Sequence, residues 1–311
     1  MTDAKPTAIL LMGPTASGKS ALAVAMAQAL NGEIISVDSA LVYRGMDIGT
    51  AKPTMEERGG IPHHLIDILD PSESFSTGQF RSQALALMAD IVHRGKVPLL
   101  VGGTMLYFSS LTQGLATLPE ADPEIRQRLD RELAELGKET LYARLTQIDP
   151  AAAARIHVND PQRIQRALEV FEISGRPLSS FFSADQQTEQ AYRYVKLIVA
   201  PEQRQTLHAK IAERFKQMLA QGFLNEVEAL RARGDLHESM PSIRCVGYRQ
   251  AWSYLNGEYD YGTMQEKAIA ATRQLAKRQF TWLRKEQHAG HLTSDATDLL
   301  GQAMRYCRDH G

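Results

Sequence analysis

Eight consecutive residues near the N-terminus carry the clearest chemical signal in the sequence. Gly13-Pro14-Thr15-Ala16-Ser17-Gly18-Lys19-Ser20 fits the pattern G-x-x-x-x-G-K-[ST] of a phosphate-binding loop. Gly13 and Gly18 allow a tight turn whose backbone N–H groups point inward, and Lys19 adds a full positive charge. Ser20 offers a hydroxyl to a magnesium ion held by the same phosphates. The loop is predicted to bind a phosphate chain, but its residues do not specify which one.

Polar residues also follow two later apolar segments. Asp38-Ser39 comes directly after the apolar run 33–37, and Gly102-Gly103-Thr104 comes directly after the run 97–101. If both runs are strands of a parallel sheet, their carboxyl ends lie where open sheets of this kind bind ligands. An aspartate at such a place also caps turns, so Asp38 alone does not decide the role. Together with the loop, these residues predict one crevice holding a carboxylate, a hydroxyl and bound phosphates.

The elements that must position these residues follow from hydrophobic periodicity. Strands are predicted at 8–12, 33–37, 64–68 and 97–101, and helices at 21–30 and 80–94. This alternation predicts an α/β fold with a doubly wound parallel sheet of the P-loop NTPase type. A further strand at 196–200 returns the chain to the sheet. A helix follows it and is ended by Gly222. Arg214 comes one residue before Phe215 of its apolar face, which is compatible with a place at the buried edge, although a solvated arginine is the more common case.

The middle of the chain changes character. Only helices are predicted between 122 and 175, at 123–137, 141–148 and 161–173, and the stretch 179–190 is polar and loop-like. We therefore expect a helical insertion domain at 116–194 within a core domain formed by 1–115 and 195–311. The tail after residue 288 is predicted to contain a short helix at 299–306 or to be partly disordered.

Composition restricts the class of protein. The chain has 311 residues, a formal net charge of −1 and only two cysteines, Cys245 and Cys307. Two distant cysteines argue against a disulfide framework or a cysteine-based zinc site. The N-terminus lacks the features of a signal peptide, and no apolar run is long enough to span a membrane. We expect a cytoplasmic monomer that makes no membrane contact.

The neutral total charge conceals basic stretches. Residues 239–257 contain two arginines among tyrosines and a tryptophan, and residues 267–285 contain six lysines and arginines with Phe280 and Trp282. Neither stretch contains an acidic residue. A third group, Gln162 to Arg166, places two cations and two amides within a short helical span. Each alone is also typical of a solvated helix face. Three basic stretches in a neutral chain favour single-stranded RNA, which needs cations for phosphates and flat partners for bases.

These segments together closely resemble bacterial tRNA dimethylallyltransferase, the tRNA isopentenyltransferase family. The resemblance rests on the loop 13–20, Asp38-Ser39 with Tyr43, the segment 47–53 (DIGTAKP), the segment 102–107 (GGTMLY), the segment 159–163 and the segment 247–250. It implies transfer of a dimethylallyl group from dimethylallyl diphosphate to the exocyclic N6 amine of the adenosine just 3′ of the anticodon. Diphosphate is released, and the partners are the donor and the tRNA anticodon stem-loop.

The resemblance also implies roles for individual residues. The loop 13–20, with Lys19, Ser20 and Mg²⁺, holds the diphosphate leaving group, and Arg214 adds a counter-charge. Asp38 accepts the proton of the adenine amine as a general base, and Thr104 lies where the two substrates meet. The implied RNA contacts are Asp38, Ser39, Ala40, Leu41, Thr104, Arg126, Gln162, Arg163, Ile164, Gln165, Arg166, Ile243, Arg244, Cys245, Val246, Gly247, Tyr248, Ala276, Lys277, Arg278, Gln279, Phe280, Thr281, Trp282 and Leu283. Leu41 departs from the glutamine of many members, and the cysteines of the eukaryotic zinc finger are absent.

Two other functions remain open at the level of sequence. An ATP-dependent small-molecule kinase would explain residues 8–30 but not the basic and aromatic C-terminal half. A non-catalytic RNA-binding protein with a nucleotide switch would explain that half but leaves Asp38 and Thr104 without a role. The strand at 97–101 ends in glycines rather than in the acidic residue that usually holds magnesium in nucleotide-hydrolysing P-loop enzymes.

Overall fold

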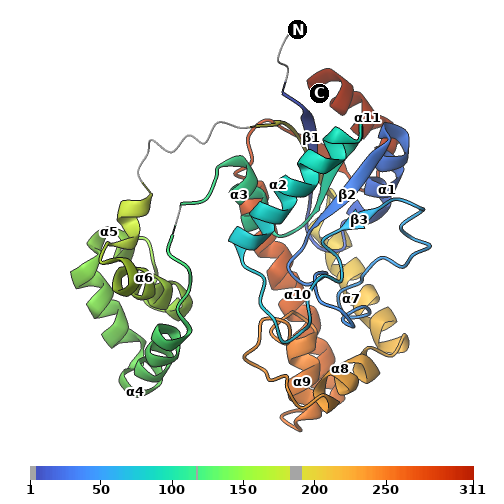
Figure 1. The fold of residues 1–311 in the computed structure, drawn as a ribbon. Helices are drawn as coiled ribbons and strands as arrows, with labels where there is room; N and C mark the ends of the chain where they lie inside the picture. Colours follow the sequence, from blue (N-terminus) through green and yellow to red (C-terminus); the bar gives the residue numbers. More distant parts are fainter. Residues whose placement is uncertain (1–4, 117, 183–190) are drawn as a thin grey trace. The chain divides into compact units, whose positions relative to one another are not determined.

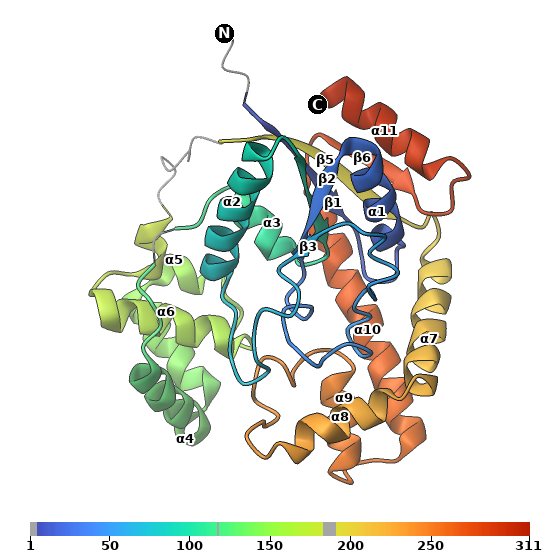
Figure 2. The same ribbon diagram turned by 45° about the vertical axis from the view of Figure 1, so that its right-hand side comes forward.

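The computed structural model describes residues 5–116, 118–182 and 191–311. The chain forms two compact units, one of Met1–Thr112 with Gln190–Gly311 and the other of Gln113–Glu189. Figures 1 and 2 show a sheet covered by helices in the larger unit and helices alone in the smaller one. The divisions after 112 and after 189 lie within five residues of the 116 and 194 expected from the sequence.

The larger unit contains one six-stranded parallel sheet, which confirms the predicted fold class. Its strands are β1 (Thr7–Met12), β2 (Gly32–Val37), β3 (His63–His64), β4 (Val97–Gly102), β5 (Arg193–Ala200) and β6 (Ala289–Thr293). They lie in the order β3-β2-β4-β1-β5-β6, and Met12 pairs with Gly102 of β4 and with Ile198 of β5. The phosphate-binding loop leaves the sheet from the central strand β1. Gly103 follows its neighbour β4, and Asp38 follows β2, the next strand on the same side.

Helices bury both faces of this sheet. Leu10 and Met12 of β1 pack toward α2 (Thr77–His93) and α3 (Met105–Thr112), whereas Ile9 and Leu11 pack toward α1 (Lys19–Leu30) and α11 (Leu299–His310). Burial on both faces explains why the central strands read as continuous apolar runs rather than as alternating ones.

The remaining helices of this unit form a layer beyond the carboxyl ends of the strands (Figure 2). They are α7 (Arg204–Ala220), α8 (Phe223–Ala232), α9 (Tyr248–Leu255) and α10 (Tyr261–Leu283). Phe215, Phe223, Tyr248 and Met264 share a core there with Tyr43, which belongs to the long loop after β2. This core fixes that loop against the helices, on the side of the sheet where the phosphate-binding loop opens.

The structure corrects one predicted element of this unit and decides between two alternatives for another. The strand expected at 64–68 is only His63–His64, because Leu65 and Asp67 adopt left-handed backbone angles (φ 60° and 57°) that end the extended chain. Of the two alternatives for the tail, the short helix is confirmed: α11 covers Leu299–His310, and the structure adds the unpredicted strand β6, which pairs with β5. Pairing of β6 with β5 and packing of Ala303 and Cys307 against α1 stabilise this segment. Both are contacts with distant parts of the chain, so the sequence of the tail could not indicate them.

The smaller unit is a bundle of short helices around its own core. It contains α4 (Pro123–Ile148), α5 (Pro150–Ala153), α6 (Pro161–Ser174) and a 3₁₀ turn at Leu178–Phe181. Gly137 (φ 79°) interrupts α4, so the predicted helices 123–137 and 141–148 are confirmed as two segments. Leu129, Leu141, Leu145 and Ile164 form the core. The predicted loop 179–190 falls largely on 183–190, outside the described residues.

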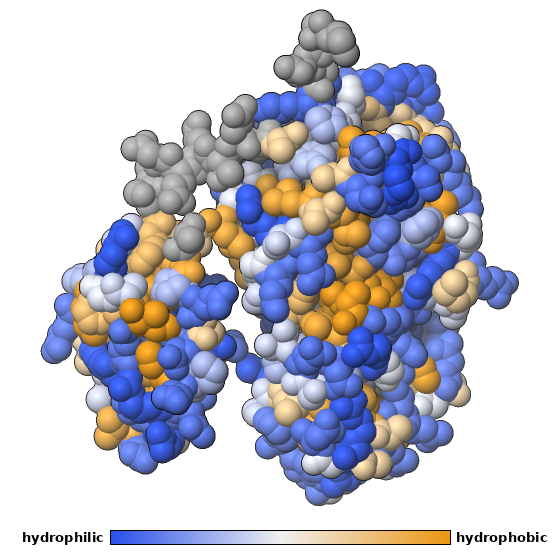
Figure 3. Space-filling view, in the orientation of Figure 1, coloured by the Kyte–Doolittle hydropathy of each residue, from blue (hydrophilic) through white to orange (hydrophobic). Residues whose placement is uncertain are grey.

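The surface of the described part of the chain is mostly polar. Figure 3 shows hydrophilic residues over most of the visible face, with hydrophobic residues gathered beside α2 in the larger unit. A groove between α2 and β3 has an apolar lining that includes Leu65, Ile66, Ile68 and Leu87. None of the described helices combines the length and apolar character needed to cross a membrane.

Candidate active site

The loop between β1 and α1 has the backbone geometry of an anion site. Ala16 (φ 62°) and Gly18 (φ 84°) adopt left-handed angles, and α1 begins at Lys19 without a side-chain cap. A Cβ on Gly13 would lie 2.2 Å from the carbonyl oxygen of Val199, so only glycine fits against β5. The uncapped start of a helix presents backbone N–H groups and the positive end of its dipole to an anion.

Two side chains of the loop are ready to meet a ligand. The Lys19 ammonium donates to the carbonyl oxygen of Pro14 at 2.7 Å, and burial lowers its pKa to about 8 against the opposing effect of Asp38. The hydroxyl of Ser17 is buried without a hydrogen-bond partner among the described residues. A buried charge and a buried unpaired hydroxyl are both costly, and an anion in the loop would compensate both.

Arg214 reaches the same loop from α7. Its guanidinium donates to the hydroxyl of Thr15 at 2.6 Å. Burial lowers the pKa of Arg214, and the charge of Asp38 acts in the opposite direction. Two cations from distant parts of the chain therefore share one partly buried place, which favours a multiply charged anion between them.

Asp38 and Thr104 lie side by side at the ends of β2 and β4. One oxygen of Asp38 accepts the backbone N–H groups of Ala40 (2.8 Å) and Leu41 (3.3 Å), and the second has no hydrogen bond within the described chain. The Thr104 hydroxyl accepts the N–H of Ser39 at 3.1 Å. The turn thus holds the carboxylate while leaving one oxygen available to a substrate proton.

These groups open into a single cavity of about 530 Å³ in the larger unit. Thr15, Asp38, Thr104 and Arg214 line it together with residues of the long loop, α7, α9 and α10. Burial and the nearby Asp38 raise the pKa of the lining Cys245 thiol to about 12, so this thiol is protonated at neutral pH and is a poor nucleophile. Thr15 and Arg214 of the predicted donor side therefore line one cavity with Asp38 and Thr104 of the predicted acceptor side.

The structure narrows the predicted RNA-contacting runs to particular helix faces. Arg244, Cys245, Val246, Gly247 and Tyr248 line the cavity, whereas Ile243 is fully buried in the core behind it. In α10, Arg278, Gln279 and Trp282 line the cavity, whereas Ala276 and Leu283 are buried. Lys277 and Phe280 face a different cavity, and Thr281 is exposed. A continuous run cannot face one partner, because successive helical residues point 100° apart.

The predicted contacts of the smaller unit are divided in the same way. Ile164 has no exposed surface and packs in the core. Arg126 and Arg166 both bind the buried carboxylate of Glu169, at 2.8 and 2.6 Å, so part of their charge serves the fold. Gln162 and Arg163 are exposed, and Gln165 donates to Asp130. The buried Ile164 is therefore not retained as an RNA contact.

Sequence reasoning missed the residue that anchors the DIGTAKP segment. Glu226 of α8 accepts the backbone N–H groups of Asp47, Ile48 and Gly49 at 2.8, 2.8 and 3.1 Å, and the Tyr248 hydroxyl also donates to it. A Cβ on Gly49 would lie 2.2 Å from Phe223. The glycine and the carboxylate thus lock the loop that forms one wall of the cavity. Because Glu226 lies almost 180 residues away, no local pattern could identify it.

Gln279 has a structural role that the sequence did not indicate. Gln279, predicted only as an RNA contact, accepts the N–H of Thr15 at 2.9 Å and donates to the carbonyl oxygen of Gly103 at 3.0 Å. It is almost fully buried and joins the phosphate-binding loop to the end of β4. Its role in this structure is to hold the donor and acceptor sides of the cavity together.

No cluster of three or more acidic, histidine or cysteine side chains suited to a metal occurs in the described ranges. A magnesium ion here would need ligands from the bound phosphates. The exposed Ser20 in the first turn of α1 is placed to add one hydroxyl oxygen. This donor set suits a magnesium–diphosphate unit, since Mg²⁺ usually takes few protein ligands and completes its shell with phosphates and water.

Comparisons with known proteins agree with one another. The family model described as IPP transferase matches residues 41–286. A tRNA dimethylallyltransferase of Methylococcus capsulatus is 59% identical, covering 97% of each chain. The crystal structure of a tRNA isopentenylpyrophosphate transferase from Bacillus halodurans is 36% identical, with a TM-score of 0.71 and coverage of 98% of this chain and 95% of that one. A eukaryotic dimethylallyltransferase captured acting on tRNA is 27% identical, with a TM-score of 0.83 over 97% of this chain and 77% of that one.

Proposed function

The chain belongs to the IPP transferase family, and from this premise we propose that it transfers a dimethylallyl group from dimethylallyl diphosphate to the N6 amine of the adenosine 3′ of the tRNA anticodon. The family expected from the sequence motifs is confirmed, and with it the enzyme class, a tRNA dimethylallyltransferase. The kinase and the RNA-binding switch are set aside.

The donor diphosphate binds in the loop 13–20. Backbone N–H groups at the start of α1, with Lys19 and Arg214, neutralise the negative charge that grows on the leaving oxygen as the allylic C–O bond breaks. The unpaired Ser17 hydroxyl and the low pKa of Lys19 support this role, because both groups gain from an anion in the loop. Where Mg²⁺ is bound with the diphosphate, Ser20 would hold it, and the ion would supply further charge neutralisation.

The acceptor base enters the cavity from the anticodon loop, at an unstacking cost of about a few kcal/mol. The free oxygen of Asp38 accepts an N6–H hydrogen bond, orients the nitrogen toward the allylic carbon and takes the proton as the new N–C bond forms. Thr104 lies beside Asp38 and positions the amine. Arg244, Arg278 and Trp282 are the groups at this wall best suited to the RNA, through charge and stacking.

The helical unit, Gln113–Glu189, is proposed as a second tRNA contact through the exposed Gln162 and Arg163. The two cysteines are free, in keeping with a reducing cytoplasm. We propose that the enzyme acts there as a monomer.

One observation carries the residue assignment: Asp38 and Thr104 line the same cavity as Arg214 and Thr15, and Arg214 donates to Thr15 of the phosphate-binding loop at 2.6 Å. The test is transfer of label from radiolabelled dimethylallyl diphosphate to unmodified tRNA, with Mg²⁺ and without ATP. We expect label on the adenosine 3′ of the anticodon. Transfer that requires ATP, or label elsewhere in the tRNA, would contradict the proposal.

A further inference from the structure

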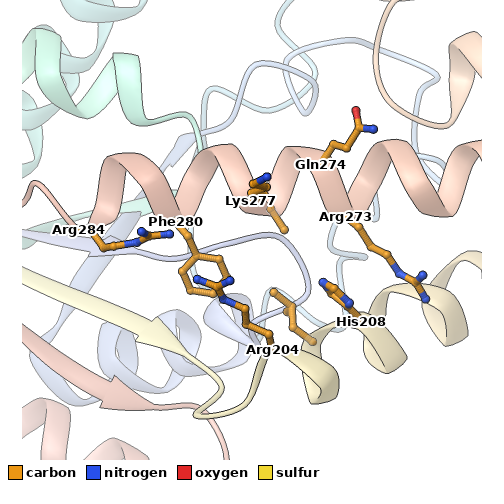
Figure 4. Close-up of a pocket in the computed structure, with 9 residues that line it drawn as sticks. Arg204, His208, Arg273, Gln274, Lys277, Phe280 and Arg284 are labelled. Carbon is orange, nitrogen blue, oxygen red and sulfur yellow. The ribbon is translucent and has the colours of Figure 1, made fainter.

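A second cavity lies outside the reaction site, between the start of α7 and the C-terminal half of α10 (Figure 4). Its volume is about 290 Å³. We call it the basic cavity, and it is lined by Arg204, Leu207, His208, Arg273, Gln274, Ala276, Lys277, Phe280 and Arg284. In the family assignment above only Ala276, Lys277 and Phe280 have a role, and none of the four other basic residues has one.

The basic cavity and the reaction cavity use opposite faces of α10. Thr272, Leu275, Gln279 and Trp282 recur at helical spacing along the face toward the reaction cavity. Arg273, Lys277 and Arg284 belong to the other face, which lines the basic cavity. At 100° per residue the two sets are about half a turn apart. The basic cavity is therefore a separate site and not an extension of the first.

Its charge is uncompensated. Five of the nine lining residues are arginine, lysine or histidine, and none is acidic. All five side chains are exposed at the rim of the cavity, and none forms an ion pair or hydrogen bond with another described residue. Cations gathered without counter-ions repel one another, and an anion bound among them removes that repulsion.

The floor is apolar and touches the phosphate-binding loop. Leu207, Ala276 and Phe280 pack with Ile211 and with Ala16, which belongs to the loop. Figure 4 shows the Phe280 ring between the side chains of Arg204 and Arg284. A ligand here would meet a flat aromatic surface and several cations at once, and it would press on residues that support Ala16.

We propose that the basic cavity binds a nucleoside phosphate, with its base on Phe280 and Leu207 and its phosphates between Arg204 and Arg273. A cavity of this size suits one small ligand. Aromatic and cationic groups together recognise a base with its phosphate, whereas inorganic phosphate would leave the apolar floor uncovered. The nucleotide is either free in solution or a single residue of the bound RNA. The proposal goes beyond the transfer reaction and does not depend on it.

The test measures ADP binding by calorimetry to the full chain carrying Lys19→Ala, which disables the phosphate-binding loop. We expect binding at one site, weakened at least about tenfold when Arg204→Glu and Arg273→Glu are added, because each reversal replaces attraction by repulsion. Arg308→Glu on α11 is the matched control and leaves affinity unchanged. Equal affinity with and without the two reversals, or affinity for inorganic phosphate equal to that for ADP, would overturn the proposal.

A second measurement avoids any dependence on how the variants fold. An azido-adenine analogue of ADP should photolabel the Lys19→Ala protein within 273–284, and labelling confined to other segments would refute the site. Unmodified tRNA then identifies the source of the nucleotide. If tRNA displaces ADP, the site takes a residue of the RNA; if both bind together, it takes a free nucleotide. Either result supports the site, and normal label transfer by Arg204→Glu would distinguish it from the reaction machinery.

Discussion

The two sides of the reaction cavity are built in different ways. The donor side centres on one continuous loop, 13–20, whose turn and uncapped helix start present backbone N–H groups, and Arg214 of α7 is added to it from a distant part of the chain. The acceptor side is assembled from the ends of β2 and β4, the segment 244–248 and one face of α10. A continuous loop can be identified from a local sequence motif. Which residues form an assembled wall depends on which face of each helix points toward the cavity. On the acceptor side the structure therefore separates cavity-lining residues from buried ones within each predicted run, whereas the donor-side run needs no such division.

The largest expected effect comes from removing the charge of the donor side. Lys19→Ala should lower turnover by about 10³-fold, because a preorganised cation is lost where the leaving group develops charge. Binding of tRNA, measured by filter retention, should change little. The matched control is Lys216→Ala, an exposed lysine on α7. A loss of tRNA affinity as large as the loss of turnover would show that the two sides are not separable.

On the acceptor side, Asp38→Asn should lower kcat about 10²- to 10⁴-fold while leaving the KM for both substrates nearly unchanged. The amide oxygen can still accept the N–H groups of Ala40 and Leu41, so the turn is kept and only the base is removed. Single-turnover label transfer measures this effect. If Asp38→Asn retained full activity, Asp38 would act by shaping the turn alone.

The pH dependence separates the sides further. Lys19 has a pKa of about 8 in the free protein, and only its charged form attracts diphosphate. Affinity for diphosphate should therefore fall by up to about tenfold per pH unit above pH 8, and not below it. Lys19→Ala should remove this dependence and Lys19→Arg should shift it upward. Between pH 8 and the ordinary lysine pKa the unfolded chain binds more protons, so this group makes the free protein more stable as pH rises. A flat affinity profile across pH 7–10 would exclude Lys19 as the titrating group.

The wall formed by the DIGTAKP segment tests how far positioning contributes. Glu226→Gln removes the charge that holds three backbone N–H groups and should cost about 2 kcal/mol of unfolding free energy, with a smaller loss of turnover. Denaturant unfolding and label transfer measure the two effects. Glu228→Gln, which changes an exposed carboxylate two residues further along α8, is the control. Loss of stability with wholly unchanged kinetics would confine Glu226 to folding.

Two neighbouring residues of one predicted RNA-contacting run, Ile164 and Arg163, should have different effects when they are substituted. Ile164→Ala should destabilise the helical unit by about 2–4 kcal/mol, since it leaves a cavity in a closed core. Arg163→Ala should leave stability unchanged and weaken tRNA binding by severalfold, with a shallower salt dependence. Thermal unfolding and salt titrations of tRNA affinity provide the comparison. Similar effects of both substitutions would contradict the division into core and contact residues.

Part of the structure could be predicted from local sequence. The loop 13–20, the parallel sheet, the break at Gly137 and the helical middle segment follow from turn chemistry and from apolar runs, which depend on near neighbours. The edge strand β6 and the early end of β3 could not be predicted from local sequence. A five-residue strand gains its stability from pairing with β5, and left-handed angles at Leu65 and Asp67 come from the surrounding chain.

The sequence by itself determined the family, the phosphate-binding loop and the candidate base, because each depends on residue type and short spacing. Only the tertiary structure decided which members of the basic runs line the cavity, that Arg214 reaches Thr15, and that Gln279 and Glu226 hold the walls in place. These contacts join residues about 180 to 260 positions apart. Their geometry is fixed by the packing of α7, α8 and α10 beyond the strand ends, and packing of that kind leaves no periodic or local trace in the chain.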